Sequence, residues 1–92
     1  MIKSFKHKGL ENFFLNGTKK GIQPQQSQKL ADLLDLLDSA KVIHDMRFPG
    51  SDLHVLKGSL KGLWAIKVSG NWRLTFQFHS GDAHIVDYRD YH

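Results

Sequence analysis

The sequence has 92 residues, which leaves room for one domain and one hydrophobic core. Hydrophobic residues make up 40% and charged residues 24%, so the composition excludes a disordered tail and a fibrous repeat. The absence of cysteine excludes disulfides, a thiolate zinc site and a cysteine nucleophile. The formal charge is +4, and the basic excess lies in residues 1–23 and 46–79. This charge fits a surface that binds a polyanion and an ordinary solvated surface equally well.

Two observations bear on location. The longest apolar runs are far shorter than the roughly 20 residues that span a membrane. The first five residues are typical of a strand and lack the apolar stretch of a signal peptide. We therefore expect a cytoplasmic protein that makes no membrane contact.

The first half of the chain predicts a short strand and two helices. Residues 2–5 are predicted to form a short first strand. Residues 9–16 have helical spacing up to Gly17, which favours the left-handed stop of a helix. Pro24 opens the second helix at a position where its missing N–H costs nothing. An apolar stripe at i, i+3, i+4 and i+7 predicts that this helix packs on a sheet: Leu30, Leu33, Leu34 and Leu37. Residues 48–52 have a composition typical of turns, so we expect them to lie in a long loop.

The second half predicts three strands joined by tight turns, at residues 63–68, 72–78 and 83–88. In the middle strand, apolar side chains alternate with Arg73, Thr75 and Gln77. One face of the sheet is therefore core and the other is polar. The order β-α-α-β-β-β predicts a single α+β domain over residues 1–92, with an antiparallel sheet packed on two N-terminal helices and a polar face open to a ligand.

Histidines and a carboxylate are the candidates for acid/base chemistry. His54 follows the turn-rich loop, where functional residues are often placed. Asp90 and His92 are two residues apart, so they project to the same side if the last strand continues to the end. No histidine or carboxylate spacing matches a metal motif, and no phosphate-binding glycine loop is present. We expect no metal and no cofactor.

Five segments carry a family resemblance: Met-Ile-Lys-Ser-Phe at 1–5, Leu-Lys-Gly at 56–58, Gly-Leu-Trp-Ala-Ile-Lys-Val at 62–68, Asn-Trp-Arg-Leu-Thr-Phe at 71–76, and Asp-Tyr-His at 90–92. In these segments and in length, the chain resembles the HigB (host inhibition of growth) toxins of the RelE/ParE superfamily of toxin–antitoxin systems. It departs at Leu60, where many relatives have arginine, and at Ser69 and Gly70, where they have a polar or acidic pair.

The resemblance implies a microbial ribonuclease fold that enters the ribosomal A site and cuts messenger RNA during translation, without a cofactor. The implied partners are the 70S ribosome with its RNA, the messenger RNA, and a cognate HigA-like antitoxin with a helix-turn-helix. The antitoxin would neutralise the toxin and repress the operon, so operator DNA would be reached only through the antitoxin.

By the same resemblance, four residues match the family's active-site positions: His54, Asp90, Tyr91 and His92. Either His92 or His54 would be the general acid, and either Asp90 or the other histidine the base. Lys57 and Arg73 would stabilise the phosphorane, and Tyr91 would stack on or orient a base. Further lysines would bind ribosomal RNA phosphates: Lys3, Lys6, Lys8, Lys19, Lys20 and Lys61.

Two other functions fit the same fold. A non-catalytic inhibitor of DNA gyrase, like the ParE branch, would lack the acid/base set, so the presence of His54, Asp90 and His92 favours the nuclease. A plain RNA-binding module would expose aromatic side chains on the sheet, whereas the alternation directs Trp72 and Phe76 to the core.

Overall fold

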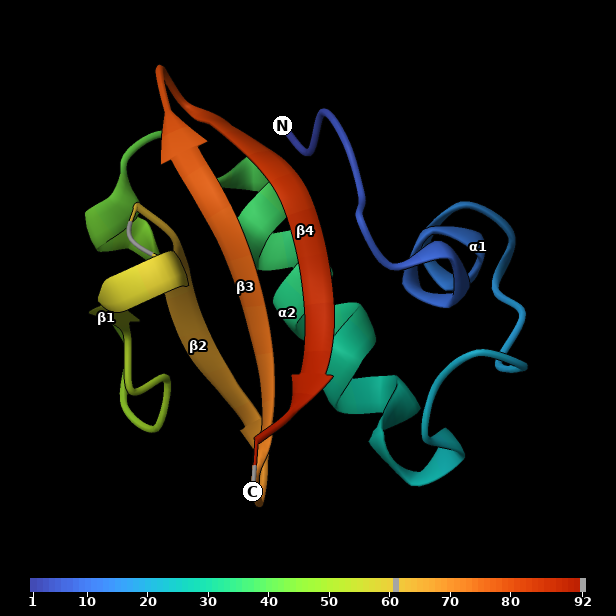
Figure 1. Cartoon of the computed structure of the whole chain (residues 1–92). Helices are drawn as coiled ribbons and strands as arrows, with labels where there is room; N and C mark the ends of the chain where they lie inside the picture. Colours follow the sequence, from blue (N-terminus) through green and yellow to red (C-terminus); the bar gives the residue numbers. More distant parts are fainter. Residues whose placement is uncertain (61, 92) are drawn as a thin grey trace.

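The computed structural model describes residues 1–60 and 62–91, which form two layers (Figure 1). Helices cover one face of an antiparallel sheet whose strand order, within the described residues, is β1-β2-β3-β4. The helices are α1 (Lys8–Asn16) and α2 (Ser27–Ser39), with 3-10 turns η1 (Pro24–Gln26), η2 (Ile43–Met46) and η3 (Gly58–Leu60). The strands are β1 (His54–Val55), β2 (Trp64–Ser69), β3 (Trp72–His79) and β4 (Asp82–Asp90). The predicted α+β class is confirmed.

Helix α1 begins and ends where its capping residues allow. The backbone N–H of Leu10 donates to Nδ1 of His7 at 2.9 Å, which satisfies a donor that has no partner inside the helix. At the other end Gly17 has φ 78°, and its N–H donates to the carbonyl of Phe13 at 2.9 Å. The predicted glycine stop is therefore confirmed, and the helix places Leu10 fully in the core.

Helix α2 supplies the largest share of the helical layer. Pro24 opens the segment as predicted, although the first turn is the 3-10 turn η1 and the α-helix begins at Ser27. The four leucines of the predicted stripe are between 0% and 2% exposed. Since fully burying a leucine contributes about 1.5–3 kcal/mol, this stripe is a main source of stability in so small a domain.

The sheet is built from two hairpins and one short edge strand. β2 pairs with β3, and β3 with β4, each with one irregularity in register: between Lys67 and Ser69 in β2, and between Thr75 and Gln77 in β3. The two-residue strand β1 pairs with β2 through His54 opposite Ala65. Its brevity explains why no alternation predicts it.

The N-terminal segment runs beside β4 without forming the regular strand predicted at residues 2–5. It makes two isolated parallel bridges instead, Ile2 to Ala83 and Phe5 to Val86. Between these bridges Ile85 has φ 48°, so the β4 backbone departs from extended geometry and a continuous ladder cannot form. The prediction of a regular strand at residues 2–5 was therefore wrong, although the segment does lie against the sheet.

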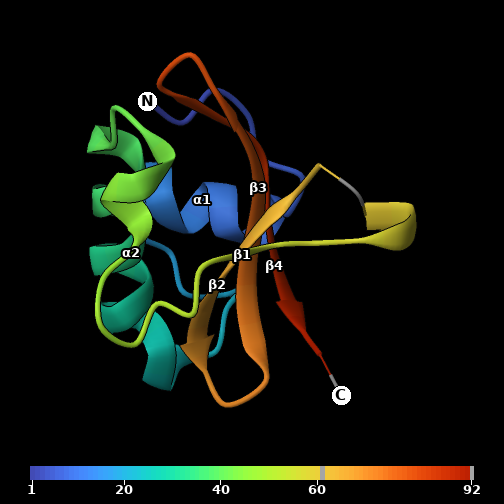
Figure 2. The same cartoon turned by 90° about the vertical axis from the view of Figure 1, so that its left-hand side faces the viewer.

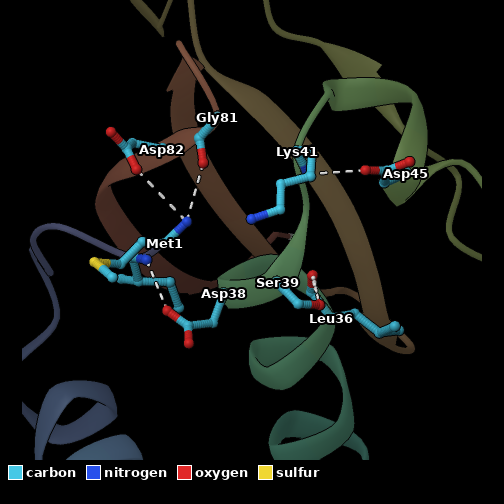
Figure 3. A network of polar contacts seen from close by, with 9 residues as sticks. Met1, Leu36, Asp38, Ser39, Lys41, Asp45, Gly81 and Asp82 are labelled. Carbon is cyan, nitrogen blue, oxygen red and sulfur yellow. Dashed lines mark hydrogen bonds and ion pairs between the residues drawn. The ribbon is translucent and has the colours of Figure 1, made fainter.

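Polar contacts fix the N-terminus to the last hairpin and to the end of α2 (Figure 3). The terminal ammonium donates to the carbonyl of Gly81 at 3.0 Å and lies 3.6 Å from an oxygen of Asp82. The N–H of Ile2 donates to Oδ1 of Asp38 at 2.9 Å. These contacts tie three segments that are distant in the sequence at one end of the sheet.

The two faces of the sheet carry the side chains that the alternation predicts, although Thr75 and Ala65 on the polar face are fully buried. Ile66, Leu74 and Phe76 are fully buried in the core cluster under the helices. Figure 2 shows the helices on one side of the sheet only, while the turn η3 projects on the other side. We call this second side the open face. Within the described residues, no helix is long and apolar enough to cross a membrane.

Candidate functional site

Strand register sorts the open face into two rows of neighbouring side chains. Lys67, Arg73 and Arg89 are register partners on β2, β3 and β4, and we call them the cation row. The next row contains His54, Ala65, Thr75 and Asp87, one from each strand, and we call it the histidine row. Because successive side chains of a strand alternate between faces, both rows lie opposite the buried Leu74 and Phe76.

The two arginines of the cation row are held in place by acceptors. Nη1 of Arg73 donates to the carbonyls of Gly70 at 2.7 Å and Trp72 at 3.0 Å. Nε of Arg89 donates to Oδ2 of Asp87 at 2.7 Å, with the two side chains only 22% and 13% exposed. Such charge-assisted contacts restrict where each guanidinium can lie.

The environment of Arg89 favours its charged form. Burial alone would lower its pKa, but the hydrogen bond and negative charge of Asp87, together with the Tyr91 hydroxyl, outweigh burial and raise the pKa. The Tyr91 hydroxyl itself is buried and forms no hydrogen bond of standard geometry with the described residues. Arg89, Asp87 and Tyr91 therefore form one electrostatic group on the open face.

His54 has an orientation suited to proton transfer. Its Nδ1 lies 2.8 Å from the carbonyl oxygen of Asp52, and its side chain is exposed. A carbonyl only accepts, so Nδ1 must carry the hydrogen of this bond. In the neutral ring Nε2 then has the free lone pair, and in the charged ring Nε2–H can donate. His54 is consequently oriented to act through Nε2.

A second buried hydroxyl lies in the histidine row. Thr75 is fully buried, and its Oγ1 has no hydrogen-bond partner among the described residues. An unpaired buried hydroxyl is costly, so native proteins leave few of them. Tyr91 shares this property, and its backbone N–H donates to the carbonyl of Asn71 at 2.9 Å, which extends the β3–β4 pairing beyond Asp90. Alternation along β4 places the Tyr91 side chain on the same face as Arg89.

The strand that carries these groups is supported from the helix-covered side. Tyr88 stacks on Trp72 with ring centroids 4.5 Å apart, and its hydroxyl donates to Oε1 of the buried Gln26. His7 meets the same ring edge-on at 5.5 Å. Burial raises the pKa of Tyr88, so the hydroxyl stays protonated and keeps its donor. These contacts fix the C-terminal half of β4.

The strand register assigns part of the sequence-predicted set to one face of the sheet. His54, Arg73 and Tyr91 share the open face, and Lys57 is exposed in the segment between β1 and the projecting turn η3 (Figure 2). Asp90 is the register partner of Trp72, so alternation assigns it to the side of Tyr88 rather than to the side of His54. Two predicted site residues, Lys61 and His92, lie outside the described residues.

Sequence reasoning missed Lys67, Asp87 and Arg89. The spacing of Asp87 and Arg89 at i and i+2 on a strand was a usable signal, because such residues share a face. Their approach to Arg73 was not readable, since it depends on the β3–β4 register and its irregularity. Among the described residues, no group of three or more histidines and acidic residues could hold a metal ion.

Comparisons with known proteins cover nearly the whole chain. The family described as RelE-like toxin of type II toxin-antitoxin system HigB matches residues 3–92. Endoribonuclease HigB of Proteus vulgaris is 47% identical over 92 residues, covering 100% of both chains. Toxin HigB-1 of Vibrio cholerae is 35% identical over 94 residues, covering 100% of this chain and 98% of that one.

A solved structure supports the fold independently of close sequence similarity. A crystal structure of a variant of YafQ from E. coli superimposes with a TM-score of 0.66, covering 98% of this chain and 91% of that chain. The sequence identity between the two is 19%, so this likeness concerns the fold alone.

Proposed function

The chain belongs to the HigB-like toxins of type II toxin–antitoxin systems, and on that premise we propose that it is an endoribonuclease that cuts messenger RNA on the translating ribosome. The observation that carries the proposal is the end-to-end identity of 47% with a protein named Endoribonuclease HigB. The open face supports it, because a histidine, two arginines and a tyrosine hydroxyl occur there together.

The chemistry we propose requires no metal. A base removes the proton of the 2′-hydroxyl, the 2′-oxygen attacks the adjacent phosphorus, and an acid protonates the 5′-oxygen as its bond to phosphorus breaks. His54 transfers one of these protons through Nε2, since its Nδ1 is bound to the carbonyl of Asp52. Arg73 and Lys57 stabilise the negative charge that develops on the phosphate oxygens.

The C-terminal residues complete the proposed site. Tyr91 lies on the open face at the end of the β3–β4 pairing, where its ring can orient a nucleotide base. Asp90 and His92 flank it in the sequence, and we assign to His92 the proton transfer that His54 does not perform. Asp90 stays a member of the proposed set through this proximity, although alternation directs it toward Tyr88.

As a toxin of a type II system, the protein is paired with an antitoxin. We propose that this partner is a helix-turn-helix protein that neutralises the toxin and carries it to operator DNA. We also propose that exposed lysines around α1 bind ribosomal RNA phosphates, because such contacts add without sequence preference: Lys3, Lys6, Lys8, Lys19 and Lys20.

Primer extension after brief induction of the toxin tests the proposed function. We expect cuts inside translated regions of messenger RNA, which disappear when the start codon of the reporter transcript is removed. A His54→Gln variant should lose these cuts, whereas His44→Gln, which changes another exposed histidine on η2, should keep them. Intact transcripts accompanied by DNA damage would overturn the proposal and favour gyrase inhibition.

A further inference from the structure

Helix α1 buries much less of its surface than α2 does. Figure 1 shows it beside β4, at the edge of the sheet opposite β1. Leu10 is its one fully buried residue, whereas Phe13 and Phe14 are half-buried and Leu15 is 65% exposed. A helix of nine residues is marginal in water on its own, so α1 depends on its caps and on this limited packing. The N-terminal cap is therefore a large part of what keeps α1 folded.

His7 supplies that cap in one protonation state only. The backbone N–H of Leu10 donates to Nδ1 of His7 at 2.9 Å, so Nδ1 presents a lone pair and the ring hydrogen lies on Nε2. A protonated ring carries hydrogens on both nitrogens and cannot accept from Leu10. It also places a positive charge at the positive end of the helix dipole. Charging His7 therefore removes the cap and adds a repulsion at the same place.

His7 also joins α1 to the sheet. Its ring meets the ring of Tyr88 edge-on, with the centroids 5.5 Å apart. The backbone N–H groups of Lys6 and His7 both donate to the carbonyl of Val86, at 2.9 Å and 3.4 Å. The cap, the ring contact and the backbone contacts to β4 thus come from two adjacent residues. A change at His7 affects the junction with β4 as well as the first turn of α1.

The charges around His7 do not favour its cation. The ionisable groups of the surrounding elements are Lys6, Lys8 and Glu11 on its own segment, Lys19 and Lys20 in the loop that brings Gly21 against Gly9, and Tyr88 and Asp90 on β4. The carboxylate of Glu11 lies 3.3 Å from Nζ of Lys8, so its charge is already paired. Tyr88 is neutral at physiological pH, because burial raises its pKa. The ion pairs among the described residues do not include His7.

We propose that His7 is a pH-sensitive switch: protonation of its ring releases α1 from β4 while the sheet and α2 stay folded. Histidine gains its positive charge as pH falls from about 8 to about 5. The cap is therefore present at the upper end of this range and is lost toward the lower end. Release is local because the buried leucines of α2 and the β2–β3–β4 pairing make no use of the cap. The released form would expose Leu10, Phe13 and Phe14, which α1 otherwise turns toward the protein.

Native-state hydrogen exchange, read by NMR from about pH 7.5 to about pH 5, tests the switch. Protection factors are used, because they correct for the intrinsic pH dependence of exchange. We expect the protection of the α1 amides to fall about 5-fold or more across this range, which corresponds to the loss of one typical cap. The amides of Leu74 and Phe76 in β3 should keep their protection, because they lie in the fully buried core.

The variant His7→Asn separates protonation from the other roles of the ring. Asparagine is a strong N-cap residue, and its side-chain oxygen accepts a hydrogen bond without titrating. The protection of α1 in His7→Asn should therefore not change over the same pH range, whatever the variant does to overall stability. The matched control His79→Gln removes an exposed histidine at the end of β3 and should keep the wild-type pH dependence.

The imidazole nitrogen signals of His7 give a second readout. At neutral pH we expect Nδ1 of His7 to be unprotonated and Nε2 to carry the hydrogen. A proton on Nδ1 at neutral pH would overturn the proposal, because that ring could not cap α1. The same pH dependence in wild type and His7→Asn would also overturn it. An equal loss of protection in α1 and β3 would show that acid unfolds the whole domain, and would overturn the local release.

Discussion

The buried hydrogen bond from Tyr88 to Gln26 is one of the contacts by which the helical side fixes strand β4, which carries Arg89 and is followed directly by Tyr91. Gln26 is 7% exposed and Tyr88 is 4% exposed, so water cannot readily replace either partner. Tyr88→Phe removes the donor and leaves Oε1 of Gln26 buried and unpaired, which costs about 1–3 kcal/mol. For a domain of this size, a loss of about 2 kcal/mol lowers Tm by about 8–16 °C.

Urea and thermal unfolding of Tyr88→Phe, Gln26→Leu and the double variant measure this contact as a cycle. We expect each single variant to be destabilised. The double variant should be less destabilised than the sum of the two, because neither polar partner is left unpaired. A loss below about 0.5 kcal/mol in Tyr88→Phe, or strict additivity in the cycle, would refute the reasoning.

The pH dependence of stability provides a second test of the role of Tyr88. Burial raises the pKa of Tyr88 above its ordinary value of 10.0, and Asp90 acts in the same direction. A pKa raised on folding contributes stability that is fully present below pH 10.0 and is lost as pH rises through the folded value. Wild type should therefore lose stability on the alkaline side, and Tyr88→Phe should show a flatter alkaline limb.

Three further predictions concern the framework. His7→Ala should cost about 1 kcal/mol, because Leu10 loses its N-terminal cap, and His7→Ser should restore most of it in thermal melts. Hydrogen bonds from the backbone N–H groups of Lys41 and Val42 lower the pKa of Asp45, so its stabilising effect is present above about pH 4 and lost as pH falls; Asp45→Asn should flatten the acid limb of Tm against pH. Gly21→Ala should destabilise the protein by about 1–3 kcal/mol, since the new Cβ would lie 2.4 Å from the Cα of Gly9. The control Gly17→Ala meets no neighbouring atom and is disfavoured only by the φ of 78° at Gly17. Equal melting temperatures of the Gly21→Ala and wild-type proteins would contradict this prediction.

The sequence predicted the structure best in segments long enough to show a repeating pattern of apolar residues. The leucine stripe of α2 and the alternation of β3 identify the helical layer and the two faces of the sheet, because burial on one side imposes the pattern directly. The segment at residues 2–5 is too short to show a period, and it forms only bridges because the backbone of Ile85 in its partner strand is not extended. Whether a segment forms a regular strand therefore depends on the backbone of the strand it pairs with as well as on its own sequence.

The site was harder to predict because it depends on register. Alternation places Arg73 and Thr75 on the polar face, yet only the β3–β4 pairing, with its irregularity after Thr75, aligns Arg89 beside Arg73. Similarly, the spacing of two between Asp90 and His92 suggests one face, whereas the pairing of Asp90 with Trp72 shows which face Asp90 takes. His54 lies on a two-residue strand, which is too short to show an alternating pattern. Only the turn-rich segment before it and the family resemblance marked His54 as a candidate site residue.

The central claim is that the open face cleaves messenger RNA through His54. Its most direct test is a time course of cleavage on purified, programmed ribosomes, comparing wild type with His54→Gln and with the exposed His44→Gln control at equal ribosome occupancy. The loss of one general acid/base predicts a rate about 100-fold or more lower for His54→Gln. His44→Gln should cleave at the wild-type rate. Wild-type cleavage by a bound, folded His54→Gln protein would contradict the account.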